Sequence, residues 1–264
     1  MTASKKTIWI TGASSGIGRS LALAYGKQPV NLILSARSEN KLQEVREEIG
    51  KPDQVSILAL DLTEIDSFPT SVEKAWNLFD GIDIMIHNGG ISQRSLAAET
   101  PLSVDRSLFE TNYFGTIALT KCLLPYFRKN KSGQFVVITS VVGKFGTPLR
   151  SSYSGSKHAL HGFFESLRAE HYHENIHVTL ICPGFVNTDV SVNALTADGS
   201  KQGTKDKATA GGLPPDLFAR KAIRAISSQK REVIIGGFLE VLAVYIKRFF
   251  PGLHARMIRK AAVT

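Results

Sequence analysis

The sequence predicts an α/β protein, built as one doubly wound domain over residues 1–264 with about seven parallel strands flanked by helices. Short β-branched and apolar runs recur at fairly even intervals, and stretches with helical spacing lie between them. This alternation is typical of a parallel sheet covered by helices on both faces. A chain of 264 residues, 43% of them hydrophobic, is also long enough to form one sizeable core.

The expected strands are residues 7–11, 31–35, 55–60, 82–87, 135–139, 177–182 and 232–235. Residues 39–49 have clear helix limits, because Ser38 precedes them as an N-cap and Gly50 follows them. Pro101 opens a later helical stretch, and Pro125 lies near the end of the next, which it kinks or ends. Residues 184–212 form a long stretch without periodicity, so we expect a lid over the ligand site.

Composition and charge exclude several classes of protein. A mean hydropathy near zero and 21% charged residues are typical of a soluble globular chain. Cys122 and Cys182 lie far apart in apolar stretches, which favours buried, inert thiols in a reducing compartment. Residues 1–6 run straight into the first strand without a signal peptide, so we expect a cytoplasmic protein. The net charge of +9 is not interleaved with aromatic residues on a recognition motif, so nucleic-acid binding is not expected.

A glycine-rich turn follows the first strand and opens the first helical stretch. Its sequence is Thr11-Gly12-Ala13-Ser14-Ser15-Gly16-Ile17-Gly18. Glycine permits a tight turn and a close approach of the backbone to pyrophosphate, and the positive end of the following helix attracts the anion. The turn therefore predicts a dinucleotide site in which the cofactor contacts Gly12, Ser14, Ser15, Gly16, Ile17 and Gly18.

The end of the second strand indicates which dinucleotide binds. An NAD site of this kind needs a carboxylate there for the ribose 2′-hydroxyl, but the chain has Arg37 and no acid before Glu39. A guanidinium forms charge-assisted hydrogen bonds to a 2′-phosphate. We therefore expect NADP(H), the alternative being that Arg37 is a solvated residue at the start of a helix.

Tyr153 and Lys157 are candidate catalytic residues because they share one face at the start of a predicted helix. A nearby cation favours the phenolate, so we expect Lys157, with the positive ring of the oxidised cofactor, to lower the pKa of Tyr153. Such a pair is weak evidence alone. Here Ser140 ends the strand 135–139 and Asn112 lies upstream, each where the carboxyl edge of a parallel sheet gathers ligands.

In this order and spacing, the glycine turn, Asn112, Ser140, Tyr153 and Lys157 resemble the short-chain dehydrogenase/reductase family over essentially the whole chain. The resemblance implies a Rossmann fold and hydride transfer between NADP(H) and a carbonyl or alcohol substrate. It implies that Tyr153 exchanges the proton and that Ser140 donates a hydrogen bond to the substrate oxygen. Lys157 would hold the ribose hydroxyls and tune Tyr153, and Asn112 would position a water that links Lys157 to solvent.

Three further segments match the cofactor site of that family. Asp61 and Leu62 would flank the adenine, and residues 183–188 resemble the loop that holds the nicotinamide carboxamide. The segment His87-Asn88-Gly89-Gly90 resembles the family's Asn-Asn-Ala-Gly, from which it departs at His87 and Gly89. The cofactor contacts that these matches imply are Asp61, Leu62, Asn88, Gly89, Gly90, Pro183, Gly184, Val186 and Thr188, together with Tyr153 and Lys157.

Residues 154–264 further resemble the branch of the family that includes dehydrogenase/reductase member 7B, notably at 156–164 and 192–195. That branch contains membrane-associated NADPH-dependent reductases, which implies a hydrophobic substrate such as an acyl- or alkyl-glycerone phosphate or a steroid or retinoid carbonyl. The family resemblance also implies a homodimer or homotetramer formed through the helices that carry Asn112 and Tyr153. A catalytically silent NADP(H)-binding sensor or scaffold is the alternative, and the intact catalytic set argues against it.

The C-terminal extension, residues 238–264, interleaves large apolar side chains with Lys247, Arg248, Arg256, Arg259 and Lys260. Such a segment suits peripheral contact with anionic lipid. Packing on the domain or on another subunit is the alternative, because either would also cover the apolar residues.

Five histidines crowd together in the sequence, namely His158, His161, His171, His173 and His177. No acid–histidine grouping among them has the spacing of a zinc site, so no metal is expected.

Overall fold

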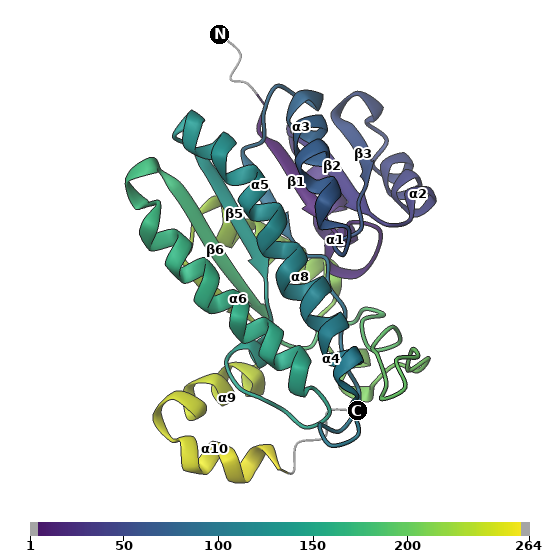
Figure 1. The fold of residues 1–264 in the computed structure, drawn as a ribbon, viewed down its shortest axis with the longest axis vertical. Coiled ribbons are helices and arrows are strands. Elements are labelled where there is room, and N and C mark those ends of the chain that lie inside the picture. The colour runs from purple at the N-terminus through teal and green to yellow at the C-terminus, as the bar shows by residue number, and fades with distance from the viewer. Residues whose placement is uncertain (1–4, 260–264) are drawn as a thin grey trace.

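The computed structural model describes residues 5–259, which form one seven-stranded sheet with helices on both faces (Figure 1). The strands are β1 (Thr7–Thr11), β2 (Asn31–Ala36), β3 (Val55–Ala59), β4 (Ile84–His87), β5 (Gly133–Ile138), β6 (Ile176–Pro183) and β7 (Glu232–Ile235). The helices are α1 (Gly16–Gly26), α2 (Glu39–Ile49), α3 (Phe68–Leu78), α4 (Leu102–Phe109), α5 (Gly115–Asn130), α6 (Ser151–Glu170), α7 (Lys207–Ala210), α8 (Pro215–Ser227), α9 (Phe238–Phe249) and α10 (Pro251–Ile258). Short 3-10 turns are η1 (Pro52–Gln54), η2 (Ile65–Ser67), η4 (Val141–Gly143) and η5 (Tyr172–Glu174), and η3 (Glu110–Phe114) is a π-helical turn.

All strand pairs are parallel, in the order β3-β2-β1-β4-β5-β6-β7. Chain order reverses beside β1, whose Ile10 pairs with Leu34 on one side and with Ile86 on the other. In open α/β sheets this reversal leaves a crevice at the carboxyl ends of the strands, where ligands bind. The predicted doubly wound α/β fold is therefore confirmed.

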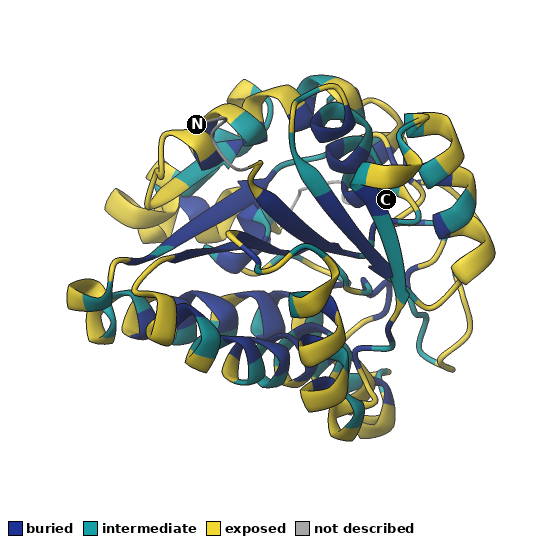
Figure 2. Ribbon diagram, turned by 90° about the horizontal axis from the view of Figure 1, so that it is seen from above, coloured by how far each residue is buried: buried dark blue, intermediate teal, exposed yellow. Residues whose placement is uncertain are grey.

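Alternate residues of the strands enter two different cores, which explains why the strands are nearly continuous apolar runs. Ile8 and Ile10 of β1 pack with residues of α1, α2 and α8, whereas Trp9 packs with residues of α3, α5 and α6. Figure 2 shows the dark, buried sheet between two helical layers whose outer faces are exposed. Burial on both faces fixes the strand register and so the positions of the loops at the carboxyl edge.

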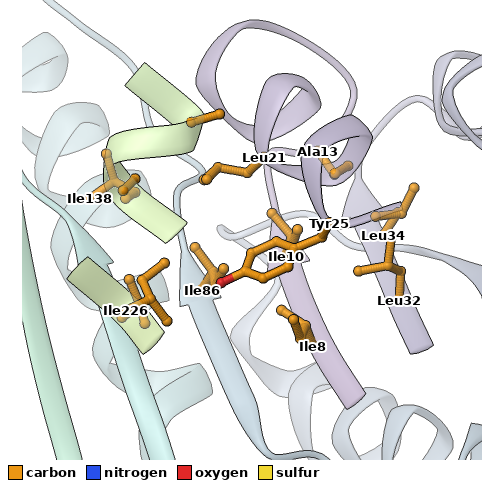
Figure 3. Close-up of a cluster of buried hydrophobic side chains, with 14 of the residues drawn as sticks. Ile8, Ile10, Ala13, Leu21, Tyr25, Leu32, Leu34, Ile86, Ile138 and Ile226 are labelled. Carbon is orange, nitrogen blue, oxygen red and sulfur yellow. The ribbon is translucent and has the colours of Figure 1, made fainter. Parts of the chain in front are cut away.

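Tyr25 of α1 lies in the first of these cores, with its ring among Ile10, Ile86 and neighbouring aliphatic side chains (Figure 3). Its hydroxyl makes no hydrogen bond within the described residues, and burial raises its pKa. The ring therefore serves to pack α1 onto the sheet, and this packing holds the glycine turn at the N-terminus of α1.

Most predicted element limits are confirmed within two residues, Ser38 is the N-cap residue of α2 as predicted, and of the two alternatives for Pro125 the end of the helix is wrong. Helix α2 ends at Gly50, which adopts a φ of 69°, but the Ser38 side chain makes no capping hydrogen bond. Pro125 does not end its helix, since α5 continues to Asn130. Leu123 and Phe127 anchor α5 on either side of the proline in the core, so tertiary packing outweighs the one lost backbone hydrogen bond.

Both cysteines are free. Cys182 is buried as predicted, and burial raises the pKa of its thiol to about 11. Cys122 is only half-buried, because it lies beside the core-facing positions of α5. Among residues 5–259, no helix is both long and apolar enough to cross a membrane.

Candidate active site

A cleft of about 730 Å³ lies at the carboxyl ends of the central strands. Its walls include eighteen of the twenty predicted site residues, namely Gly12, Ser14, Ser15, Gly16, Ile17, Arg37, Asp61, Leu62, Asn88, Gly89, Gly90, Ser140, Tyr153, Lys157, Pro183, Gly184, Val186 and Thr188. Gly18 and Asn112 do not line the cleft and lie behind it. Residues far apart in the sequence are thus brought together as the topology predicts.

The glycine turn presents bare backbone to this cleft. Gly12 and Gly16 have φ of 64° and 53°, a conformation that other residues rarely adopt. A Cβ on Gly12 would lie 2.8 Å from Nδ2 of Asn88, and one on Gly18 would lie 2.2 Å from the carbonyl oxygen of Gly12. The first turn of α1 has no acidic side chain to offset the positive end of the helix. The turn therefore fits the pyrophosphate of a dinucleotide.

Asn88 fixes the backbone at the start of this turn. Its Nδ2 donates to the carbonyl oxygens of Thr11 at 3.0 Å and Gly12 at 3.2 Å, and its backbone N–H donates to Oγ1 of Thr11 at 3.1 Å. The neighbouring His87 is buried, bonds Thr120 at 2.8 Å and has its pKa lowered to about 3 by burial. The departure from the family pattern at His87 therefore places a neutral ring in the core, not in the cofactor cleft.

At the adenine end of the cleft, Arg37 lies near a second cation that the sequence analysis missed. Lys41 lines the cleft together with Arg37 and Ser38, whereas Glu39 does not. Lys41 lies in the first turn of α2, four residues after Arg37, and a second cation so close in sequence to Arg37 was a usable signal. Asp61 completes the region, where its Oδ1 accepts hydrogen bonds from Thr63 N at 2.9 Å and Thr63 Oγ1 at 2.8 Å.

Tyr153 and Lys157 lie on α6, with Nζ of Lys157 at 5.9 Å from the centre of the phenol ring. Nζ donates to the carbonyl oxygen of Ile138 at 2.9 Å, and burial lowers the pKa of Lys157 to about 8. The lysine is therefore held at the end of β5, in the part of the cleft wall that includes Ser140.

The pKa of Tyr153 is raised, mainly because burial penalises the phenolate. Arg150, a side-chain hydrogen bond with Ser140, and Arg94 oppose this rise, in that order. Lys157 is not among these groups, and its expected effect on the Tyr153 pKa together with the oxidised cofactor ring stays a prediction. The Lys157 ammonium donates to the carbonyl oxygen of Ile138, and Arg150 and Arg94 are the cations that lower the Tyr153 pKa.

Asn112 sits in the π-helical turn η3 and clamps the loop after β4. Its Oδ1 accepts from the backbone N–H of Ile91 at 2.8 Å, and its Nδ2 donates to Ile91 O at 2.9 Å and to Ser156 Oγ at 3.1 Å. A Cβ on Gly90 would lie 2.9 Å from this Oδ1 and 3.7 Å from Lys157 Nζ. Asn112 therefore stands behind Gly90, next to Lys157, and its role in positioning a water stays a prediction.

A buried ion-pair network that the sequence analysis missed borders the catalytic residues. Nη2 of Arg94 lies 2.5 Å from Oδ2 of Asp206, and Nη2 of Arg150 lies 3.6 Å from the same oxygen. Their side chains are at most 6% exposed. The three residues are distant in sequence and follow no periodic pattern, so no local signal could have joined them.

A second cavity of about 330 Å³ adjoins the first at Ser140 and Tyr153. Apolar side chains dominate it, including Val141, Val142 and Phe145, and both arginines of the network line it. A hydrophobic molecule with one polar group can therefore reach the catalytic hydroxyls from this side.

The predicted lid, residues 184–212, forms part of both cavities. Hydrogen bonds of 2.8 Å from Leu195 N to Ser92 O and of 2.7 Å from Arg94 N to Leu195 O attach it to the loop after β4, and Asp206 anchors it through Arg94. These bonds tie the segment over the site, and its opening as a lid stays a prediction.

His161, Glu165 and Glu232 bring possible metal-ligand atoms within 4.8 Å of one another, a grouping that sequence spacing did not indicate. Nζ of Lys144 already lies 2.6 Å from Glu232, and a side-chain hydrogen bond with His161 is the main reason why the pKa of Glu232 falls to about 2. The lysine supplies the positive charge that a metal would bring.

Comparisons with known proteins agree with this geometry. The sequence profile described as short chain dehydrogenase matches residues 6–198. A Xenopus laevis protein, dehydrogenase/reductase SDR family member 7B, is 40% identical over 251 residues, covering 92% of this chain and 78% of that protein. A short-chain dehydrogenase/reductase from Burkholderia phymatum in complex with NAD superposes with a TM-score of 0.84 at 19% identity, covering 96% of each chain. A short-chain dehydrogenase from Burkholderia cenocepacia in complex with NADP has a TM-score of 0.80 at 21% identity, covering 98% of this chain and 99% of that one.

Proposed function

Since this chain belongs to the short-chain dehydrogenase/reductase family and is an NAD(P)-dependent oxidoreductase, we propose that it interconverts a carbonyl and an alcohol on a hydrophobic substrate with NADP(H). The observation that carries the proposal is the position of Tyr153 and Ser140. Both residues line the dinucleotide cleft and also the apolar cavity. A substrate oxygen that is hydrogen-bonded to them therefore lies where the cleft meets the cavity.

The bound dinucleotide supplies the hydride to the carbonyl carbon, or takes it back in the reverse direction. Tyr153 donates its phenolic proton to the carbonyl oxygen as the C–O π bond breaks, and Ser140 donates a hydrogen bond to the same oxygen. Burial, which raises the pKa of Tyr153, keeps the phenol protonated and ready to act as the acid in reduction. Arg150 and Arg94 stabilise the phenolate that the transfer leaves.

Arg37 and Lys41 support NADP(H) over NAD(H), because two cations at the adenine end of the cleft match a 2′-phosphate. The solved relatives include one complex with NAD and one with NADP, so the preference rests on these side chains.

The second cavity supports an apolar substrate with a polar group. Arg94 and Arg150, which pair with the carboxylate of Asp206, line this cavity together with Glu240, so its wall places charged groups beside the apolar side chains. An acyl- or alkyl-glycerone phosphate and a steroid or retinoid carbonyl both combine an apolar body with a polar group, so both remain candidate substrates.

A homodimer or homotetramer through α4, α5 and α6 is part of the proposal. Leu102 and Phe114 in this region are 64% and 44% exposed, which favours contact with another subunit. Sedimentation velocity of the full chain tests this, and a monomer at all concentrations would contradict it.

The catalytic proposal is tested by following oxidation of NADPH and NADH with a panel of aldehydes, ketones and an acyl-glycerone phosphate. We expect turnover with NADPH at a kcat/KM at least about tenfold above that with NADH. A protein that binds NADPH but turns over none of the panel would instead support the silent sensor or scaffold.

A further inference from the structure

The two C-terminal helices, α9 and α10, form a hairpin that leaves most of its apolar side chains exposed. No residue of α9 is buried, although most of its residues are apolar. The hairpin lies at one end of the molecule, below α6, at the yellow end of the chain (Figure 1). Eight of the fifteen large exposed hydrophobic side chains within the described residues belong to it, the most exposed being Phe238, Leu239, Phe249 and Phe250 at 79%, 75%, 68% and 64%.

The opposite side of the hairpin packs on the catalytic domain. Ala243, Val244 and Ile258 contact the cluster of Val141, Val142 and Phe145 beside Ser140. The ring of His254 lies 4.8 Å from that of Phe145, centre to centre. One face of the hairpin therefore packs on the rest of the domain. The other face, which carries the exposed apolar side chains, takes no part in this packing.

Charges on the hairpin indicate what the exposed face meets. Lys247, Arg248, Arg256 and Arg259 lie on the hairpin or directly after it, and Glu240 is its one acid within the described residues. Glu240 is half-buried and accepts a hydrogen bond from the backbone of Phe185 at 3.4 Å, so it is turned toward the domain. A second copy of the chain on this face would bring equal positive charges together, whereas an anionic lipid surface complements them.

We propose that the exposed face of the α9–α10 hairpin inserts into the interface of an anionic membrane. Aromatic and aliphatic side chains flanked by basic ones are the combination by which helices lie in the headgroup region. Leu239, Ala243 and Ile258 also line the cavity beside Tyr153, so the same hairpin forms part of the cavity wall. As a consequence that rests on the proposed function, a lipid-like carbonyl passes from the bilayer into this cavity along the hairpin.

Vesicle co-sedimentation of the full chain tests the membrane contact without reference to catalysis. We expect binding to phosphatidylcholine vesicles that contain phosphatidylserine, and weak binding to phosphatidylcholine alone. Lys247→Gln with Arg248→Gln should weaken binding to the anionic vesicles by about fivefold for each charge removed. The matched control is Lys74→Gln with Lys129→Gln, which removes two exposed lysines elsewhere and should leave vesicle binding unchanged.

The apolar contact is tested by Phe238→Glu with Phe249→Glu, which should weaken vesicle binding by at least about tenfold. Tyr172→Glu is the control, because Tyr172 is 72% exposed but lies far from the hairpin in the sequence, after α6. Equal and negligible binding of wild type and variants would overturn the proposal. A second outcome would also overturn it: the wild type self-associates without binding vesicles, and Phe238→Glu with Phe249→Glu abolishes that self-association. The exposed face would then bind a second copy of the chain.

The substrate route is tested with the same Phe238 and Phe249 variant. We expect reduction of a vesicle-bound long-chain carbonyl to fall in parallel with vesicle binding, and reduction of a short, water-soluble aldehyde to stay at the wild-type rate. Equal rates on the vesicle-bound carbonyl would overturn the route. Failure of the wild type to turn over either carbonyl would contradict the proposed function and leave the measured vesicle binding standing.

Discussion

Gly18→Ala probes whether the glycine turn is shaped by its contact with the loop after β4. The added Cβ would lie 2.2 Å from Gly12 O and 2.5 Å from Asn88 Nδ2, both far inside van der Waals contact. Gly12 O is backbone, and Asn88 is held by its bonds to Thr11 and Gly12, so neither group can yield without breaking a hydrogen bond. Overpacking of this kind costs about 1–3 kcal/mol, which exceeds the gain of up to about 1 kcal/mol that alanine brings to a helix.

Gly162→Ala is the matched control, because Gly162 also lies in a helix but its Cβ would meet no atom within 4 Å. We expect thermal denaturation to show a lower Tm for Gly18→Ala and a Tm equal to or above wild type for Gly162→Ala. Fluorescence titration should show NADPH affinity reduced at least about tenfold by Gly18→Ala alone, since the displaced groups line the cleft. Equal Tm shifts for the two variants, with NADPH affinity unchanged, would refute the argument.

Three further changes test neighbouring parts of the account. Arg37→Ala should weaken NADPH binding about tenfold or more and leave NADH binding unchanged, and equal losses for both in titrations would contradict the 2′-phosphate contact. Arg150→Gln should raise the pKa of Tyr153 further, because the guanidinium lowers it, so the pH at half-maximal alcohol oxidation should move upward; an unmoved pH–rate profile would oppose this. Asp206→Asn should lower the free energy of unfolding in urea by about 3–5 kcal/mol, because Arg94 would keep a buried charge without its carboxylate, and a change below about 1 kcal/mol would count against it.

The fold was predictable because its signals are local. The central strands are short apolar runs buried on both faces, and the Gly50 helix end is a one-residue signal. The position of the cleft was also predictable, because the topology of a parallel sheet brings the loops after its strands to one edge.

Other parts of the candidate site depend on contacts between residues distant in sequence, which no local pattern encodes. Arg94 and Asp206 are 112 residues apart, and their pairing exists only once the segment 184–212 folds over β4. The sequence also placed the control of the Tyr153 pKa on Lys157, since spacing shows which residues share a helix face but not where the ammonium is directed. In the structure that ammonium bonds Ile138, and Arg150, which no spacing pointed to, lowers the pKa of the phenol.

The central claim is that the hydroxyl of Tyr153 transfers the proton, and Tyr153→Phe tests it most directly. Tyr25→Phe is the control, because the Tyr25 hydroxyl makes no hydrogen bond within the described residues. With any carbonyl that the wild type reduces, we predict that Tyr153→Phe lowers kcat by at least about a hundredfold while the Kd for NADPH stays within a factor of about two, and that Tyr25→Phe changes neither. An undiminished kcat in Tyr153→Phe, or a loss explained wholly by weaker NADPH binding, would contradict the account.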